Sequence, residues 1–274
     1  MNIRIWGCRG SLAAPGPKTM RYGGNTSCVE VRAEAGGIVI LDAGTGIREL
    51  GLTELPQRIH LLLTHFHLDH IEGLGFFAPV WRPETELHVW GPPSPTRSLE
   101  ARVARYFSPP LFPRHLAELP CRLRFHDVPV EEWELEGLRI CAAPVTHPGP
   151  TLGYRLREND RALAYIPDHE PALGAPMEEL PGEWISGWEL AAEADLLLHD
   201  GQFTEEEYPS RIGWGHSSVA HAVSFAARAE ARRLLLFHHD PSRTDDQLEE
   251  LLARARELGD RDVELAYDGA GLAV

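Results

Sequence analysis

Short apolar runs recur along the chain, and their spacing predicts a protein built largely from β-strands. The alternating residues 28–32 and the apolar run 38–41 are separated by residues 33–37, which contain Gly36 and Gly37. This pattern is typical of a β-hairpin. Together with a short strand predicted at 3–6, it favours antiparallel pairing at the start of the chain over a parallel crossover.

Further strands and two helices are predicted in the rest of the chain. Ser217 and Ser218 can cap a helix at 219–232, and Asp245 opens an amphipathic helix that runs to residue 258. The remaining strands are expected at 59–63, 123–128, 133–135, 138–143, 153–157, 162–166, 194–198, 234–237 and 263–267. Since we find no short-period repeat and no linker, we predict a single domain over residues 1–274.

A proline-rich stretch lies between Gly91 and Cys121. It frames residues 98–107, whose apolar side chains have helical spacing and whose neighbours include Arg97, Arg102 and Arg105. Two interpretations stay open: a packed surface excursion, or a lid insertion at about 92–121. As a lid, the segment would offer arginines to the phosphate of a nucleotide and aromatic rings to its nucleobase.

Histidines and aspartates gather where the predicted strands end. The densest group follows the run 59–63 and consists of His65, His67, Asp69 and His70. Single residues of the same kind follow other apolar runs, namely Asp42, His147, Asp168, Asp200 and His238. One metal site explains this pattern more simply than separate coincidences do. Imidazole and carboxylate ligands without a thiolate suit zinc, manganese or iron, and a bridging carboxylate suits a pair of ions.

Asp42 has two interpretations. It can lie beneath the histidine cluster and orient it, since metal-bound imidazoles usually donate their second N–H to a carboxylate or carbonyl. Alternatively, it caps the helix that follows. The glycines of Asp42-Ala43-Gly44-Thr45-Gly46 fit neither a P-loop nor a dinucleotide-binding turn.

The segment Thr64-His65-Phe66-His67-Leu68-Asp69-His70 is similar to the Thr-His-x-His-x-Asp-His signature of the metallo-β-lactamase fold superfamily, and the later motifs follow in the same order. The resemblance covers essentially the whole chain. It implies an α/β fold: a four-layer αβ/βα sandwich with two mixed β-sheets, helices outside, and two divalent metal ions at one edge.

The resemblance also implies a ligand set. The first metal would be held by His65, His67 and His147, the second by Asp69, His70 and His238, and Asp168 would bridge the two. His239 is the alternative to His238, which we favour because it directly follows the strand. Zinc is the first choice of metal, with manganese or iron as alternatives.

Three later segments resemble the ribonuclease Z and phosphodiesterase-like branch of the superfamily: 147–155, 198–201 and 215–218. In that branch a histidine in a Gly-His-Ser motif acts at the phosphate and is held by an acidic residue of a His-Glu-Ala-Thr motif. His216 and Asp200 occupy the corresponding positions. Asp200 replaces the usual glutamate, and Gly201-Gln202 replaces Ala-Thr.

Charge narrows the class of substrate. The chain of 274 residues has 41 acidic and 26 basic side chains, so its net charge is -15. An extended nucleic-acid surface needs clustered Lys and Arg, and we expect none. The chain also lacks a long basic Gly/Pro-rich arm of the kind that grips transfer RNA. A small anionic substrate remains compatible, because bound metals supply local positive charge.

Nothing in the sequence indicates secretion or a membrane. The N-terminus enters a strand-like pattern without a signal-peptide pattern, and no apolar run reaches the roughly 18 residues of a membrane helix. Cys8, Cys28, Cys121 and Cys141 are scattered, as expected of reduced thiols. We therefore expect a cytoplasmic protein without a membrane partner, and a homo-oligomer stays open.

These patterns predict a dinuclear metal-dependent hydrolase that acts on a small phosphodiester, such as a cyclic nucleotide or a short oligonucleotide, through a metal-bridging hydroxide. Asp69, His216 and Asp200 are the predicted catalytic residues. The alternatives are a ribonuclease Z-like RNA endonuclease, a thioesterase or other ester or lactam hydrolase, and a non-catalytic metal-binding module. His169 and Glu170 flank Asp168, and whether they line the pocket stays open. We interpret His60, His88, His115, His126, His199 and His221 as structural.

Overall fold

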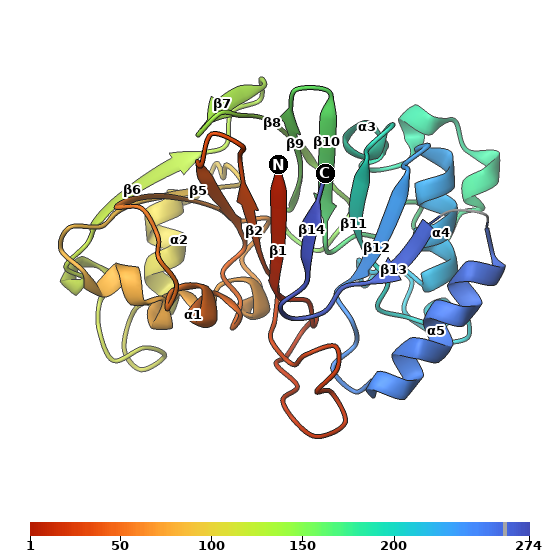
Figure 1. Cartoon of the computed structure of the whole chain (residues 1–274), viewed down its shortest axis with the longest axis horizontal. Helices are drawn as coiled ribbons and strands as arrows, with labels where there is room; N and C mark the ends of the chain where they lie inside the picture. The colour runs from red at the N-terminus through yellow and green to blue at the C-terminus, as the bar shows by residue number, and fades with distance from the viewer. Residues whose placement is uncertain (260–261) are drawn as a thin grey trace.

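The computed structural model describes residues 1–259 and 262–274 and consists of two β-sheets packed face to face (Figure 1). The first sheet has the order β14-β1-β2-β3-β4-β5-β6. Its strands are β1 (Asn2–Gly7), β2 (Cys28–Arg32), β3 (Ile38–Leu41), β4 (Arg58–Leu62), β5 (Glu86–Gly91), β6 (Arg122–Asp127) and β14 (Gly271–Ala273).

The second sheet has the order β13-β12-β11-β10-β9-β8-β7. Its strands are β7 (Trp133–Leu135), β8 (Leu138–Pro144), β9 (Leu152–Glu158), β10 (Arg161–Ile166), β11 (Leu196–Asp200), β12 (Arg233–Phe237) and β13 (Asp262–Leu265). Ile5 and Leu156 are among the apolar side chains that fill the layer between the two sheets. This inner layer joins the halves of the sandwich.

Helices cover the outer faces of both sheets (Figure 1). The first sheet carries α1 (Ile47–Leu50) and α2 (Leu99–Tyr106), and the second carries α3 (Trp188–Ala191), α4 (Val219–Arg228) and α5 (Asp245–Glu257). Each helical layer has its own apolar core, one containing Val103 and the other containing Ala226. The predicted four-layer αβ/βα sandwich with two mixed sheets is therefore confirmed.

Strand direction explains why the candidate residues meet. The predicted hairpin is confirmed, since β2 and β3 pair antiparallel, but β3 and β4 run parallel, as do β10, β11 and β12. Parallel strands present their carboxyl ends at one edge of a sheet, where α/β folds place their ligands. Asp42, His65, Asp168, Asp200 and His238 stand at these ends.

Several predicted boundaries were wrong. The helix predicted at 219–232 ends at Arg228, because Glu230 has a left-handed φ of 55° that an α-helix cannot continue through. The strand predicted at 194–198 runs instead from Leu196 to Asp200, so it includes His199. Sequence patterns also missed β5 and the closing strand β14.

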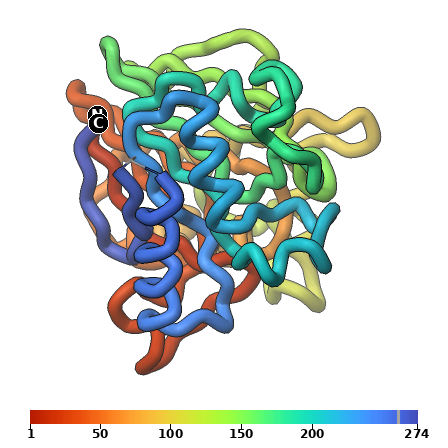
Figure 2. The backbone as a smooth tube through the Cα atoms, turned by 90° about the vertical axis from the view of Figure 1, so that its right-hand side faces the viewer, coloured from red at the N-terminus to blue at the C-terminus, as the bar shows by residue number. Residues whose placement is uncertain are grey.

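The final strand β14 pairs antiparallel with β1 at the start of the chain. The predicted last strand at 263–267 is β13 (Asp262–Leu265), so it does not close the chain. Figure 2 shows the two termini side by side, and the Met1 amino group donates to the Val274 carbonyl over 3.2 Å. This short strand completes the edge of the first sheet.

The proline-rich segment packs onto the outer core of the first sheet. Its buried apolar side chains are Leu99, Val103, Phe107, Phe112, Leu116 and Leu119. The Arg102 guanidinium lies 4.6 Å from the centre of the Phe66 ring, beside His65 and His67. The segment is thus adjacent to the histidine cluster.

Two further expectations concern the cysteines and the membrane. Cys8, Cys28, Cys121 and Cys141 are all free thiols, and only Cys141 is not buried. Within residues 1–259 and 262–274, no helix is both long and apolar enough to cross a bilayer.

Candidate metal centre

Two groups of candidate ligands share one carboxylate. The ligand atoms of His65, His67, His147 and Asp168 lie within 4.8 Å of one another, and so do those of Asp69, His70, Asp168 and His238. Asp168 belongs to both groups, which is the arrangement that a bridging ligand requires. The structure therefore brings together all seven residues predicted to bind metal.

Asp42 organises the histidine-rich loop from below. It ends β3 with a left-handed φ of 59°, and its carboxylate accepts the Thr64 amide N–H over 2.8 Å. The same carboxylate lies 2.8 Å from His70 Nδ1 and accepts the Tyr165 hydroxyl over 2.9 Å. With Nδ1 turned to Asp42, His70 directs Nε2 toward Asp168.

His147 and Asp69 are also held by backbone groups. His147 Nδ1 donates to the Gly215 carbonyl over 2.8 Å, which leaves Nε2 directed into the cluster. Asp69 accepts the Ser11 amide N–H over 2.8 Å. His67 is the solvent-exposed member of the cluster, so the site opens to solvent on that side.

Buried His65 Nε2 has no hydrogen-bond partner, and the buried atoms His70 Nε2 and Asp168 Oδ1 lie 3.0 Å apart without the geometry of a hydrogen bond. Buried polar atoms are normally hydrogen bonded, so nitrogen and oxygen atoms that converge here without hydrogen bonds have the arrangement of cation ligands. The residues present therefore fit divalent metal ions.

The electrostatics point the same way. Burial raises the pKa of the Asp168 carboxyl, but the histidines around it, His238 first, outweigh burial and hold the pKa well below its usual range. Burial lowers the pKa of His147 to about 4, so this imidazole is neutral near pH 7. An ionised carboxylate beside a neutral imidazole is the state in which both bind metal. At His238 burial lowers the pKa, but Asp168 and Asp69 outweigh burial and raise the pKa to about 9, so metal binding there would release a proton from the ring.

A second acid–histidine pair lies beside the ligands. His216 Nδ1 and Asp200 Oδ2 are 2.7 Å apart, and the His216 ring stacks on His238 with 4.9 Å between ring centres. Asp200 is fully buried and also accepts the backbone N–H groups of His169 and Gln202. Asp200 therefore fixes the imidazole of His216 at the edge of the site.

Comparisons with known proteins place this arrangement in a family. The family model described as "Beta-lactamase superfamily domain" matches residues 38–239, more than half of the chain. The chain belongs to the beta-lactamase superfamily. Ribonuclease Z of Myxococcus xanthus is 30% identical to this chain, and the match covers 76% of this chain and 78% of that protein. The chain therefore falls in the ribonuclease Z-like branch, as its motifs predicted.

Two solved structures share the fold of this superfamily member. The metallo-β-lactamase fold protein YhfI from Bacillus subtilis has a TM-score of 0.73 at 17% identity, covering 99% of this chain and 98% of that one. A diphosphatase from the PhnP family has a TM-score of 0.72 at 20% identity, covering 100% of this chain and 97% of that one. At these identities the likeness concerns the fold alone.

The geometry separates His238 from His239. His238 Nε2 lies 3.2 Å from both Asp69 Oδ2 and Asp168 Oδ2. His239 turns away, and its Nε2 lies 2.9 Å from the Ala266 carbonyl oxygen, to which it donates. Of the two, His238 is the one placed as a ligand.

We expect His239→Gln to keep two metals per chain, because its side chain does not face the cluster. His238→Gln is expected to lose at least one metal, since it removes a nitrogen from the shared group. Elemental analysis of both purified variants measures the difference. Metal loss in His239→Gln with full retention in His238→Gln would reverse the assignment.

Sequence reasoning missed several residues that support the site. Gln202 Oε1 lies 3.2 Å from His238 Nδ1, and Tyr165, Ser11 and Gly215 contact Asp42, Asp69 and His147 as described above. Gln202 could have been suspected from its place just after Asp200. Ser11 and Gly215 act through backbone atoms, which leave no signature in side-chain type.

The remaining histidines lie outside the ligand clusters in the described residues. His60, His88 and His126 form a row across β4, β5 and β6, where His88 Nδ1 lies 2.9 Å from His126 Nε2. His169 and His199 are fully buried, with His169 Nδ1 2.9 Å from His199 Nε2. Neither His169 nor Glu170 supplies an atom to the clusters.

Burial of neutral histidine predicts acid sensitivity. Burial lowers the pKa of His199 from 6.5 to about 4, so the unfolded chain binds its proton more readily than the folded one. The resulting stability is present above pH 6.5 and is lost as the pH falls toward 4, by up to about 1.4 kcal/mol per pH unit. In metal-free protein, His199→Asn should flatten this dependence of unfolding free energy on pH. His115→Asn, at an exposed position, should leave it unchanged.

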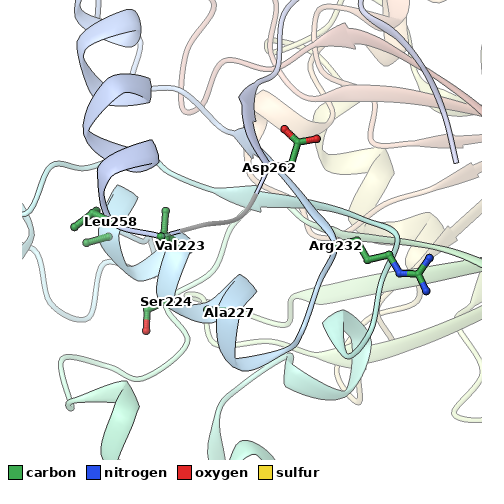
Figure 3. A pocket seen from close by; sticks show the side chains of 8 residues that line it. Val223, Ser224, Ala227, Arg232, Leu258 and Asp262 are labelled. Atoms are coloured by element: carbon green, nitrogen blue, oxygen red, sulfur yellow. The ribbon is translucent and has the colours of Figure 1, made fainter.

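A cavity of about 710 Å³ lies elsewhere on the molecule, between α4, the end of α5 and β13 (Figure 3). Val223, Ser224, Ala227, Arg232 and Asp262 are among its lining residues. No predicted catalytic or metal-binding residue lines it. The candidate chemistry therefore belongs to the edge of the sheets and not to this cavity.

Proposed function

We propose that this protein is a dinuclear metal-dependent phosphodiesterase that hydrolyses a small phosphodiester. The contact between His216 and Asp200, 2.7 Å long at the edge of the ligand cluster, carries the proposal. A histidine that is not among the seven predicted ligands, fixed by a buried carboxylate, can donate a hydrogen bond to a phosphoryl oxygen or a proton to a leaving oxygen.

The ligand residues and the pair have separate roles in this proposal. When bound, two divalent cations would lower the pKa of a water molecule and polarise the phosphoryl group. Asp69 accepts a proton from the attacking water, and the Ser11 amide N–H holds this carboxylate in place. His216 protonates the leaving oxygen or stabilises charge on the phosphoryl group, while Asp200 keeps its Nδ1 occupied.

The names of similar proteins support phosphate-ester chemistry. One relative is called ribonuclease Z, and one protein of the same fold is called a diphosphatase. The first name favours an RNA endonuclease as the second candidate function. The net charge of -15 favours a small substrate, because a long RNA would meet repulsion away from the metals.

A chromogenic panel tests the proposal. Purified protein loaded with zinc, manganese or iron is offered bis(p-nitrophenyl) phosphate, an aryl thioester, a β-lactam and a structured RNA. We expect turnover of the phosphodiester and no cleavage of the lactam. Activity on the thioester with none on any phosphodiester would refute the proposal. Cleavage of RNA alone would favour the second candidate function, an RNA endonuclease.

A further inference from the structure

Glu170 lies two residues after Asp168 and is fully buried, but its carboxylate points away from the ligand clusters. It accepts the Tyr208 hydroxyl over 2.8 Å and the backbone N–H groups of Gly213 and Gly215 over 3.0 and 2.8 Å. Both carboxylate oxygens are used. Glu170 therefore ties the loop 213–215 to the segment that carries Asp168.

The tied loop contacts one residue of the site and directly precedes another. The Gly215 carbonyl accepts Nδ1–H of His147 over 2.8 Å, and His216 follows directly in the chain. Gly215 has a left-handed φ of 84°, and a Cβ atom there would lie 2.5 Å from His147 Nδ1. Only glycine permits so close an approach, so the position of this loop sets the orientation of the His147 ring.

The backbone of Glu170 fixes the other side of the same contact. Its amide N–H donates to the Thr146 carbonyl over 3.0 Å, one residue before His147. The backbone before His147 and the loop that receives its ring N–H are thus both bound to Glu170. A shift of Glu170 would change the relative position of these two segments.

We propose that Glu170 is a positioning residue that sets, through the loop 213–215, the orientation of His147 as a metal ligand and of His216 at the phosphate. The part concerning His216 rests on the proposed function, whereas the part concerning His147 does not. The Glu170 carboxylate supplies no atom to the candidate ligand groups of the described residues. It acts by holding backbone N–H groups that have no other buried acceptor in the described contacts.

Glu170→Gln tests this proposal with little change of volume. A glutamine has one acceptor oxygen, and its NH₂ group would face a backbone N–H that now donates to carboxylate. We expect metal affinity, measured by competition with a chelator, to weaken roughly 10-fold, the scale seen for partners of metal ligands. We expect kcat for methyl phenyl phosphate to fall roughly 10- to 100-fold.

The leaving group separates positioning from general loss of stability. Methyl p-nitrophenyl phosphate releases a weaker base, which needs less help from an acid, so its kcat should fall less than that of methyl phenyl phosphate. His216→Ala should change the ratio of the two kcat values in the same direction. If Glu170 were merely structural, Glu170→Gln would lower the melting temperature and leave both the ratio of the kcat values and the metal affinity unchanged.

Glu206→Gln is the matched control, since Glu206 is exposed in the same stretch of chain and pairs with Arg254. Tyr208→Phe is the second variant should Glu170→Gln not fold, and it removes one of the three donors to Glu170. In Tyr208→Phe we expect both the loss of metal affinity and the change in the ratio of the two kcat values to be about one third as large as in Glu170→Gln.

The two measurements test the two parts of the proposal separately. An unchanged metal affinity in both variants overturns the part concerning His147, and an unchanged ratio of kcat values overturns the part concerning His216. A wild-type protein that hydrolyses no phosphodiester refutes the proposed function instead, and the chelator competition still decides the role of Glu170 toward His147.

Discussion

Replacing Asp168 with alanine is expected to abolish metal pairing and turnover. Asp168 Oδ1 lies 3.0 Å from His70 Nε2, and Oδ2 lies 3.2 Å from His238 Nε2. The same Oδ2 is 3.7 Å from Nε2 of both His65 and His147. One buried carboxylate thus faces ring nitrogens of both ligand groups.

The expected size of this effect follows from the chemistry that is lost. Without the shared anion, two cations close together would repel each other uncompensated, so elemental analysis should find at most one metal per chain. Turnover of bis(p-nitrophenyl) phosphate should fall at least about 10³-fold. Asp246→Ala, at an exposed position of α5, is the control and should keep both metals. Two metals and normal turnover in Asp168→Ala would show that Asp168 does not bridge the metals.

Replacing His216 with alanine is expected to spare both metals and lower kcat by roughly 10²- to 10⁴-fold, the usual contribution of a general acid or base. The ring of His216 lies beside His147 and His238, with 4.9 Å between ring centres in each case. Asp200 and Gly215 hold the surrounding backbone independently of the imidazole, so the ligand groups should persist. Asp200→Asn should give a smaller loss, because it keeps the shape of the contact and removes its charge.

Two measurements on His216→Ala check this expectation, namely metal content and kcat on the preferred diester. His115→Ala serves as the control because His115 is exposed and remote from the clusters. An unchanged kcat would take His216 out of the mechanism. Loss of a metal would make it a ligand instead, in the group formed by Asp200, His216 and His238.

The sequence predicted the fold and the gathering of the candidate ligands because both follow from short-range patterns. A histidine-rich motif after an apolar run identifies a strand end, and parallel strands bring their ends together. Asp42, Asp168 and Asp200 could therefore be assigned to one edge before any contact was known. Metal binding by Asp168, the orienting role of Asp42 and the catalytic role of Asp200 stay predictions.

The supporting contacts could not be predicted, for a physical reason. Ser11 and Gly215 reach Asp69 and His147 through backbone atoms, which every residue has. The position of Glu170 near Asp168 in the chain left open whether it lines the pocket, whereas in the structure three donors from the segment 208–215 draw its carboxylate away. Such contacts depend on where distant loops lie, and periodicity carries no information on that.

The boundaries of secondary structure failed where local conformation outweighs periodicity. The apolar pattern continues past Arg228, but Glu230 turns left-handed and the chain enters β12. Strand β14 has only three residues and includes a glycine, so its pairing with β1 and not its composition defines it. Backbone conformation at Glu230 thus sets the first boundary, and a tertiary contact defines the second element.

The proposed function requires that two metals at the shared carboxylate hydrolyse a phosphodiester. Its most direct test is a titration of zinc into chelator-treated protein, with turnover of bis(p-nitrophenyl) phosphate as the signal. We expect turnover to be absent without metal and to reach its maximum at two equivalents per chain. A maximum at one equivalent, or no phosphodiester turnover at any metal content, would contradict it.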